Sequence, residues 1–281
     1  MFVSLASDTT FKHVVLAPLE SPDGARYVTP LTCDRVYFSG SRGLCMVSEA
    51  QRPDVATHLA FVFDEHFKAL KTIALAGPPS RTRLSADGRR AAFTVFDEGH
   101  SYADGVFSTR TTIVDTIKGD VLGDLEEFKV SRDGQPFASV DFNFWGVTFA
   151  RDGNRFFATL RTGGRAHLVE GDIDAREAHV LIPGAECPSL SPDNARIAFK
   201  KELAGSRGWW MLSLFDVATG SVRALSSETR SVDDQVEWLD DANLLYFLPG
   251  ADGNHIWRLR TDVAEAPQIF VQAGSSPAVI R

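Results

Sequence analysis

The sequence has few cysteines and no long apolar run, and these two absences exclude several classes of protein. Its three cysteines are Cys33, Cys45 and Cys187. This odd, sparse number does not predict a disulfide framework, and the lack of a Cys-x-x-Cys pair argues against a zinc motif of that type. Because no run of about 18 apolar residues is present, we expect no transmembrane helix.

A strong positive charge is also missing. The chain has 37 acidic and 29 basic residues, which gives a formal net charge of −8. Nucleic-acid backbones and anionic membrane surfaces both attract clusters of basic residues, so we expect neither a nucleic-acid partner nor membrane insertion. The histidines are scattered, and the glycine-rich nucleotide-binding motifs are absent, which argues against a local histidine metal site or nucleotide binding.

The sequence does contain a repeat of β-hairpins. In four segments, an apolar strand is followed by a turn containing Asp and then by a second apolar strand: 81–96, 146–160, 187–201 and 235–248. Asp, Asn and Gly tolerate the backbone conformations of tight turns. A second hairpin follows each of these, so each unit has four antiparallel strands, here called a to d. Long capped amphipathic helices are absent, which predicts a nearly all-β chain.

The repeat predicts a single domain over 1–281, an all-β, six-bladed propeller of four-stranded antiparallel blades. The expected blades are 33–75, 81–126, 144–183, 187–226, 234–272 and a closing blade made of 276–281 and 1–31. In the closing blade, the C-terminal segment would supply strand a and the N-terminal segment the other strands. This pairing leaves no open sheet edge between the first and last blades.

The turns resemble the Ser-Pro-Asp-Gly repeat of the TolB-like six-bladed propellers. They are Ser85-Ala86-Asp87-Gly88, Ala150-Arg151-Asp152-Gly153, Ser191-Pro192-Asp193-Asn194 and Leu239-Asp240-Asp241-Ala242. The resemblance implies the fold rather than an activity, because these residues build turns. Members of this family are often exported envelope proteins that bind partners. The resemblance therefore implies a periplasmic or extracytoplasmic location if a signal segment was removed, and a cytoplasmic location otherwise. The start, MFVSLASDTTFKH, lacks the features of a signal peptide.

The lengths of the connections predict which face of the propeller binds. The d–a and b–c connections lie on one face, here called the long-loop face, where each strand a begins beside the central channel. The long connections are all of these two kinds: 49–56, 97–108, 127–143 and 202–208. Long loops usually carry function, so we expect a protein, peptide or small-molecule partner at this face.

Polar and aromatic residues near this face form the candidate ligand site. They are His100, Tyr102, Arg110, Asn143, Trp145, Glu186, Asp233, Asp234 and Gln235. The carboxylates predict an acidic channel mouth that favours cationic groups, with calcium as a candidate ligand of Asp233 and Asp234. The alternative is structural: Glu237, between Val236 and Trp238, is expected to be buried between blades and paired with an arginine.

Two functional hypotheses of different classes follow. The first is a non-catalytic binding propeller, expected to be a monomer with no cofactor other than the candidate calcium. The alternative is a hydrolase, lyase or isomerase whose active site lies at the same channel mouth. Its candidate acid–base residues are His100, Tyr102, Asp141, Glu186, Asp233 and Asp234. A structural module of a larger complex is a third possibility. Pairing of every carboxylate with a cation would weaken the enzyme hypothesis.

Overall fold

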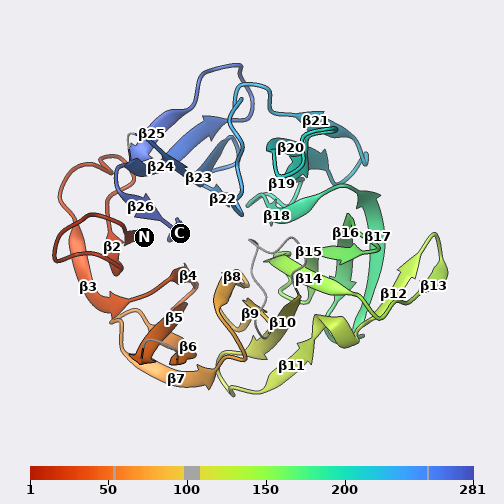
Figure 1. Ribbon diagram of the computed structural model, residues 1–281, viewed down its shortest axis with the longest axis horizontal. Coiled ribbons are helices and arrows are strands. Elements are labelled where there is room, and N and C mark those ends of the chain that lie inside the picture. Colours follow the sequence, from red (N-terminus) through yellow and green to blue (C-terminus); the bar gives the residue numbers. More distant parts are fainter. Residues whose placement is uncertain (53–54, 98–107, 252) are drawn as a thin grey trace.

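The computed structural model describes residues 1–52, 55–97, 108–251 and 253–281. Six β-sheets surround a central axis like the blades of a propeller (Figure 1). Five sheets have four strands and one has six. The predicted all-β, six-bladed fold is confirmed. Within the described ranges, the one helical element is the 3-10 turn η2 (Leu125–Glu127), and no helix is long and apolar enough to cross a membrane.

The strands of the first five blades follow the expected order. Blade one contains β4 (Arg35–Ser39), β5 (Arg42–Arg52), β6 (Val55–Asp64) and β7 (Ala69–Ala74). Blade two contains β8 (Pro79–Leu84), β9 (Arg90–Phe96), β10 (Thr109–Asp115) and β11 (Val121–Asp124). Blade three contains β14 (Asn143–Phe149), β15 (Arg155–Thr162), β16 (Arg165–Asp172) and β17 (Glu177–Pro183). Blade four contains β18 (Glu186–Leu190), β19 (Arg196–Glu202), β20 (Trp210–Asp216) and β21 (Val222–Ala224). Blade five contains β22 (Glu237–Trp238), β23 (Asn243–Gly250), β24 (Gly253–Arg260) and β25 (Gln268–Val271).

Blade six is closed by both ends of the chain, as predicted. Its strands, in spatial order, are β26 (Gly274–Ser275), β1 (Phe2–Ser4), β2 (His13–Leu16) and β3 (Tyr27–Thr32). Strand β26 pairs with β1, and Met1 and Ala278 continue the contact by exchanging backbone hydrogen bonds. The two ends of the chain therefore meet beside the central channel (Figure 1).

The Asp-containing turns form the a–b hairpins for the expected reason. Gly88 has a φ of +69°, a conformation that residues with a Cβ rarely adopt. The Asp87 carboxylate accepts hydrogen bonds from the Ser85 hydroxyl at 2.6 Å and the Arg89 amide at 3.0 Å. A Cβ on Gly88 would lie 2.5 Å from the carbonyl oxygen of Ser39 in blade one. The motif therefore builds the turn and permits close packing of neighbouring blades.

Two of the predicted long loops are strands instead. Part of 127–143 forms a hairpin of β12 (Lys129–Arg132) and β13 (Gln135–Phe137), which adds to the outer edge of blade three by parallel pairing of β12 with β17. Val130 joins the hydrophobic core between blades two and three. Most of 49–56 extends β5 and β6. Both predictions were wrong because added strands were counted as loops.

The prediction about disulfides was also wrong. Cys33 and Cys45 form a disulfide, with Cα atoms 5.5 Å apart, while Cys187 is buried and free. Cys33 lies just before β4, and Cys45 lies on β5, the strand that pairs with β4. Neighbouring antiparallel strands bring Cα atoms to a separation that a disulfide can bridge. Counting cysteines could not reveal this pair, because its proximity depends on the strand register.

Candidate functional site

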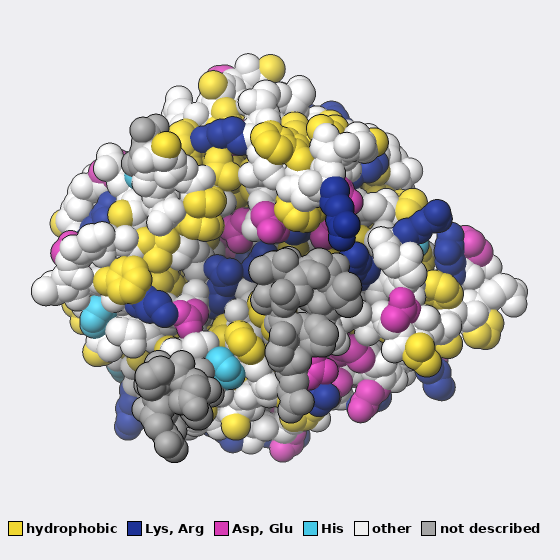
Figure 2. Space-filling view, in the orientation of Figure 1, with side chains coloured by type: hydrophobic (Ala, Val, Ile, Leu, Met, Phe, Trp, Pro, Cys, Tyr) yellow, Lys and Arg dark blue, Asp and Glu magenta, His cyan; other side chains and the backbone are white. Residues whose placement is uncertain are grey.

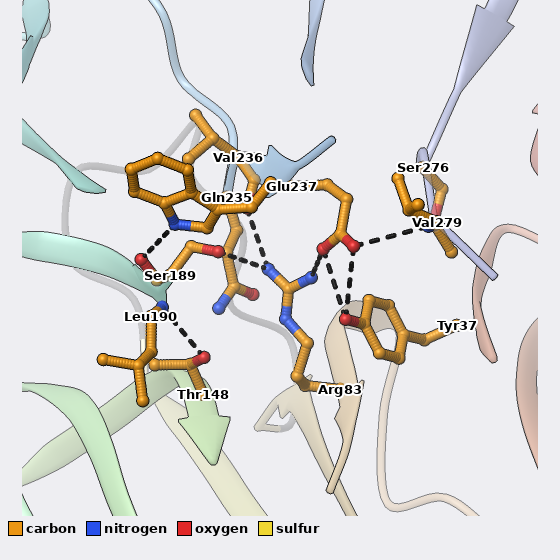
Figure 3. A network of polar contacts seen from close by, with 12 residues as sticks. Tyr37, Arg83, Thr148, Ser189, Leu190, Gln235, Val236, Glu237, Ser276 and Val279 are labelled. Carbon is orange, nitrogen blue, oxygen red and sulfur yellow. Dashed lines mark hydrogen bonds and ion pairs between the residues drawn. The ribbon is translucent and has the colours of Figure 1, made fainter. Parts of the chain in front are cut away.

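A polar network lies at the centre of the propeller. It joins the next-to-last residues of four inner strands with Tyr37 of β4 (Figure 3). These residues are Arg83, Thr148, Ser189 and Glu237. Inner strands of all blades run beside the same axis, so equivalent positions meet there although they lie far apart in the sequence. The repeat therefore positions this network.

Glu237 is the centre of this network. Its carboxylate accepts hydrogen bonds from Arg83, from the Tyr37 hydroxyl at 3.2 Å and from the Val279 amide at 3.3 Å. The side chains of Arg83 and Glu237 are only 6% and 4% exposed. Burial, assisted by the Glu237 charge, raises the pKa of Tyr37 to about 12. The expected burial and arginine pairing of Glu237 are observed. Arg83 comes from blade two, across the channel, and Arg281, from the closing blade next to blade five, lies 3.6 Å from the carboxylate.

A cleft between blades three and four opens on the long-loop face. Its volume is about 570 Å³, within the range of small-ligand pockets. We call it the blade 3–4 cleft; its lining residues are Arg161, Gly164, Arg165, Ala166, Pro183, Gly184, Glu186, Lys200, Lys201, Glu202, Arg207, Gly208, Trp210 and Asp233. These residues come from b–c and d–a connections and the adjoining strand ends. Glu186 and Asp233, two of the predicted site residues, therefore lie together.

Lys200 organises the inner wall of the cleft. Its side chain is only 2% exposed, and its ammonium group bonds to Asp233 and lies 3.8 Å from Glu186. Burial disfavours the charge of Asp233, but Lys200, together with Arg81 and Arg35, holds the pKa of Asp233 below its usual value. The ammonium group also lies 4.3 Å from the centre of the Trp210 ring, and Trp210 Nε1 donates to Glu186 at 3.1 Å. Both predicted carboxylates are thus bound within the protein.

Asp234 and Gln235 make structural contacts at the start of the inner strand of blade five. Both residues are buried. Asp234 accepts a hydrogen bond from the Phe247 amide at 2.9 Å. The Gln235 amide donates to the carbonyls of Val147 and Pro188, so it ties blades three, four and five together. Asp233 is more accessible than these two, because 40% of its side chain is exposed.

Trp145, a predicted ligand-site residue, is only 1% exposed. It lies on the inner strand β14, where side chains pack between blades. Asn143, at the start of that strand, accepts a hydrogen bond from the Thr109 amide at 2.8 Å. Arg110 is half-exposed and lies 3.9 Å from the carboxylate of Asp124. None of these three residues lines the blade 3–4 cleft.

Asp141 holds a turn rather than facing the cleft. Its carboxylate accepts hydrogen bonds from the Ser139 hydroxyl at 2.6 Å, from Thr162 and from the Gly163 amide at 2.7 Å. These bonds, first that from Ser139, lower the pKa of Asp141 to about 2. The remaining two predicted site residues, His100 and Tyr102, lie outside the described residues.

The described part of the channel mouth carries basic as well as acidic side chains. Figure 2 looks onto the long-loop face, where Lys and Arg side chains lie beside Asp and Glu side chains around the central hollow. Arg35 and Arg81 also help to lower the pKa of Asp233. Across the described ranges, no group of three or more His, Cys, Asp or Glu side chains could hold a metal ion. Calcium at Asp233 and Asp234 therefore stays a prediction.

The basic residues of the cleft and Trp210 are not among the predicted site residues. Trp209 is 43% exposed, and Trp210 lines the cleft. Lys200 and Lys201 lie near the end of the second strand of blade four, and Arg165 begins the third strand of blade three. The feature of the sequence that could have indicated these residues is their position at predicted strand ends on the long-loop face.

Comparisons with known proteins show the fold. No family model matches the chain, and no curated protein matches it in sequence. Among solved structures, a putative TolB from Agrobacterium tumefaciens is 13% identical, with a TM-score of 0.57 over 89% of this chain and 85% of that one. A nidogen/laminin complex gives 10% identity and a TM-score of 0.55 over 85% of this chain and 82% of that one.

A third similar structure is a puromycin-hydrolyzing peptidase from Mycobacterium tuberculosis. It is 13% identical, with a TM-score of 0.54 over 89% of this chain but only 40% of the peptidase chain. The shared part is therefore less than half of that enzyme. With their low identities, these likenesses concern the fold alone. The chain is a six-bladed β-propeller that shares its fold with TolB and with propellers of unrelated function.

Proposed function

We propose that this protein is a non-catalytic binding propeller that engages a protein or peptide partner, or a small ligand, at its long-loop face. The observation that carries the proposal is the blade 3–4 cleft. It lies on that face and is lined by connections and strand ends. Connections of this kind change without disturbing the blades, which makes them suitable for recognition.

The pairing of the carboxylates favours binding over the enzyme alternative. A general acid or base has to exchange a proton with its substrate. Asp233 is bound to Lys200, Glu186 to Trp210, and Asp234 to a backbone amide. Each of these contacts stabilises the charged form or occupies an oxygen of the carboxylate. The nidogen/laminin complex provides an example of a similar fold in a protein assembly.

Site-specific crosslinking tests the proposal. A photoreactive amino acid would replace Arg207, at the cleft, and separately Lys68, between β6 and β7 on the opposite face. Both positions are exposed, so the replacements should leave the fold intact. The proposal predicts that a partner from the native host crosslinks at position 207 and not at 68. Crosslinking only at 68, or at neither position, would contradict it.

A further inference from the structure

The blade 3–4 cleft gathers basic residues in a chain that is otherwise acidic. Five basic and three acidic residues line it, whereas the whole chain has a net charge of −8. The acidic residues are Glu186, Glu202 and Asp233. Two of these carboxylates belong to the Lys200 cluster, and Glu202 accepts a hydrogen bond from the Gly208 amide at 2.8 Å. The acidic groups of the cleft therefore have partners inside the protein.

Three of the basic residues lie at the rim instead. Arg165, Lys201 and Arg207 are exposed and come from the start of β16, the end of β19 and the connection after β19. None of them forms an ion pair with another residue of the described part of the chain. Their side chains therefore give the cleft an excess of positive charge over its three carboxylates.

Trp210 gives the same cleft a fixed aromatic surface. Its Nε1 group is held by Glu186, and Lys200 lies against its ring. A ring held in this way can contact an incoming chain with little loss of side-chain entropy. Ala166 and Pro183 add apolar surface to the lining. The cleft thus combines a cationic rim with an aromatic and apolar interior.

We propose that the blade 3–4 cleft binds an acidic peptide segment of the partner, which deepens the proposed function and rests on it. Asp or Glu side chains of the segment would pair with Arg165, Lys201 and Arg207, and its other side chains would lie against Trp210. Complementary charges of this kind provide specificity and speed association. A nucleic-acid strand fits less well, because its closely spaced phosphates need a long basic stripe, whereas the whole chain has a net charge of −8.

Fluorescence anisotropy with three labelled probes tests this inference: a Glu-Ala repeat peptide, a Lys-Ala repeat peptide and an oligothymidylate. The acidic peptide should bind, and Lys201→Glu with Arg207→Glu should weaken its binding about tenfold or more, since each tenfold step needs only about 1.4 kcal/mol. The neutral pair Lys201→Gln and Arg207→Gln should give a smaller loss. Lys68→Glu, an exposed charge reversal on the opposite face, should leave the affinity unchanged.

Several results would overturn the inference. They are equal binding of the acidic peptide by wild type and the charge-reversed variant, stronger binding of the Lys-Ala peptide, and stronger binding of the oligothymidylate. If none of the probes binds while a partner still crosslinks at position 207, this inference fails and the proposed binding function stands. If crosslinking at 207 fails as well, both fail. Unchanged melting temperatures of the variants would show that lost binding does not reflect unfolding.

Discussion

Glu237→Gln should destabilise the protein strongly, although the change removes no more than a charge. The variant keeps an acceptor for Tyr37 and Val279 but leaves the guanidinium of Arg83 buried without its counter-ion. Breaking one side of a buried ion pair costs about 3–5 kcal/mol. At about 2 °C per kcal/mol for a domain of this size, the melting temperature should fall by about 6–10 °C. Urea unfolding monitored by circular dichroism measures the free energy directly.

A double-mutant cycle separates the ion pair from other effects of the substitution. Arg83→Met combined with Glu237→Leu removes both charges, so its cost should be smaller than the sum of the two single changes by about 1–3 kcal/mol. Asp262→Asn is the matched control, because it and its partner Arg260 are solvent-exposed, and exposed ion pairs contribute little to stability. Additive single effects, or a Glu237→Gln variant as stable as the control, would refute the role assigned to this network.

Three other predictions address the disulfide, a buried acid and calcium. Replacing Cys33 and Cys45 by Ser should lower the free energy of unfolding by about 3 kcal/mol. Thiol counting on the denatured wild type should give one free thiol before reduction and three after it. Three free thiols before reduction would contradict the pairing. Burial raises the pKa of Glu126 from 4.5 to about 8. The stability that its proton provides is therefore complete below pH 4.5 and lost as the pH rises through 8, and Glu126→Gln should remove this part of the pH dependence. If the free energy of unfolding depends on pH equally in the variant and the wild type, the effect assigned to Glu126 is contradicted. If calcium binds Asp233 and Asp234, millimolar calcium should raise the melting temperature relative to EDTA. An unchanged melting temperature would remove calcium from the account.

The fold was predictable from the sequence because its signal is local and repeated. Turns such as Ser85-Ala86-Asp87-Gly88 carry their own hydrogen bonds and recur in several blades. A wrong prediction for the turn of one blade therefore does not change the predicted fold. The hairpin β12–β13 was missed although 127–143 contains a turn at Asp133 and Gly134 between apolar residues. It falls outside the four-strand repeat, so the repeat gave no reason to expect it.

The candidate site was predictable only in part. The face of the propeller followed from connection lengths, and Glu186 and Asp233 do line its cleft. The positions of Lys200 and Trp210 within it depend on how blades three and four pack, which no local pattern encodes. The same is true of the pair formed by Arg83 and Glu237, because its members come from opposite sides of the ring.

Hydrogen–deuterium exchange in the presence of the crosslinked partner tests the central claim most directly. If the long-loop face is the binding surface, the partner should slow exchange in peptides covering 161–166 and 200–210, which contain most of the cleft residues. Exchange at 64–68, on the opposite face, should not change. Protection at 64–68 with none at the two cleft segments would contradict the account.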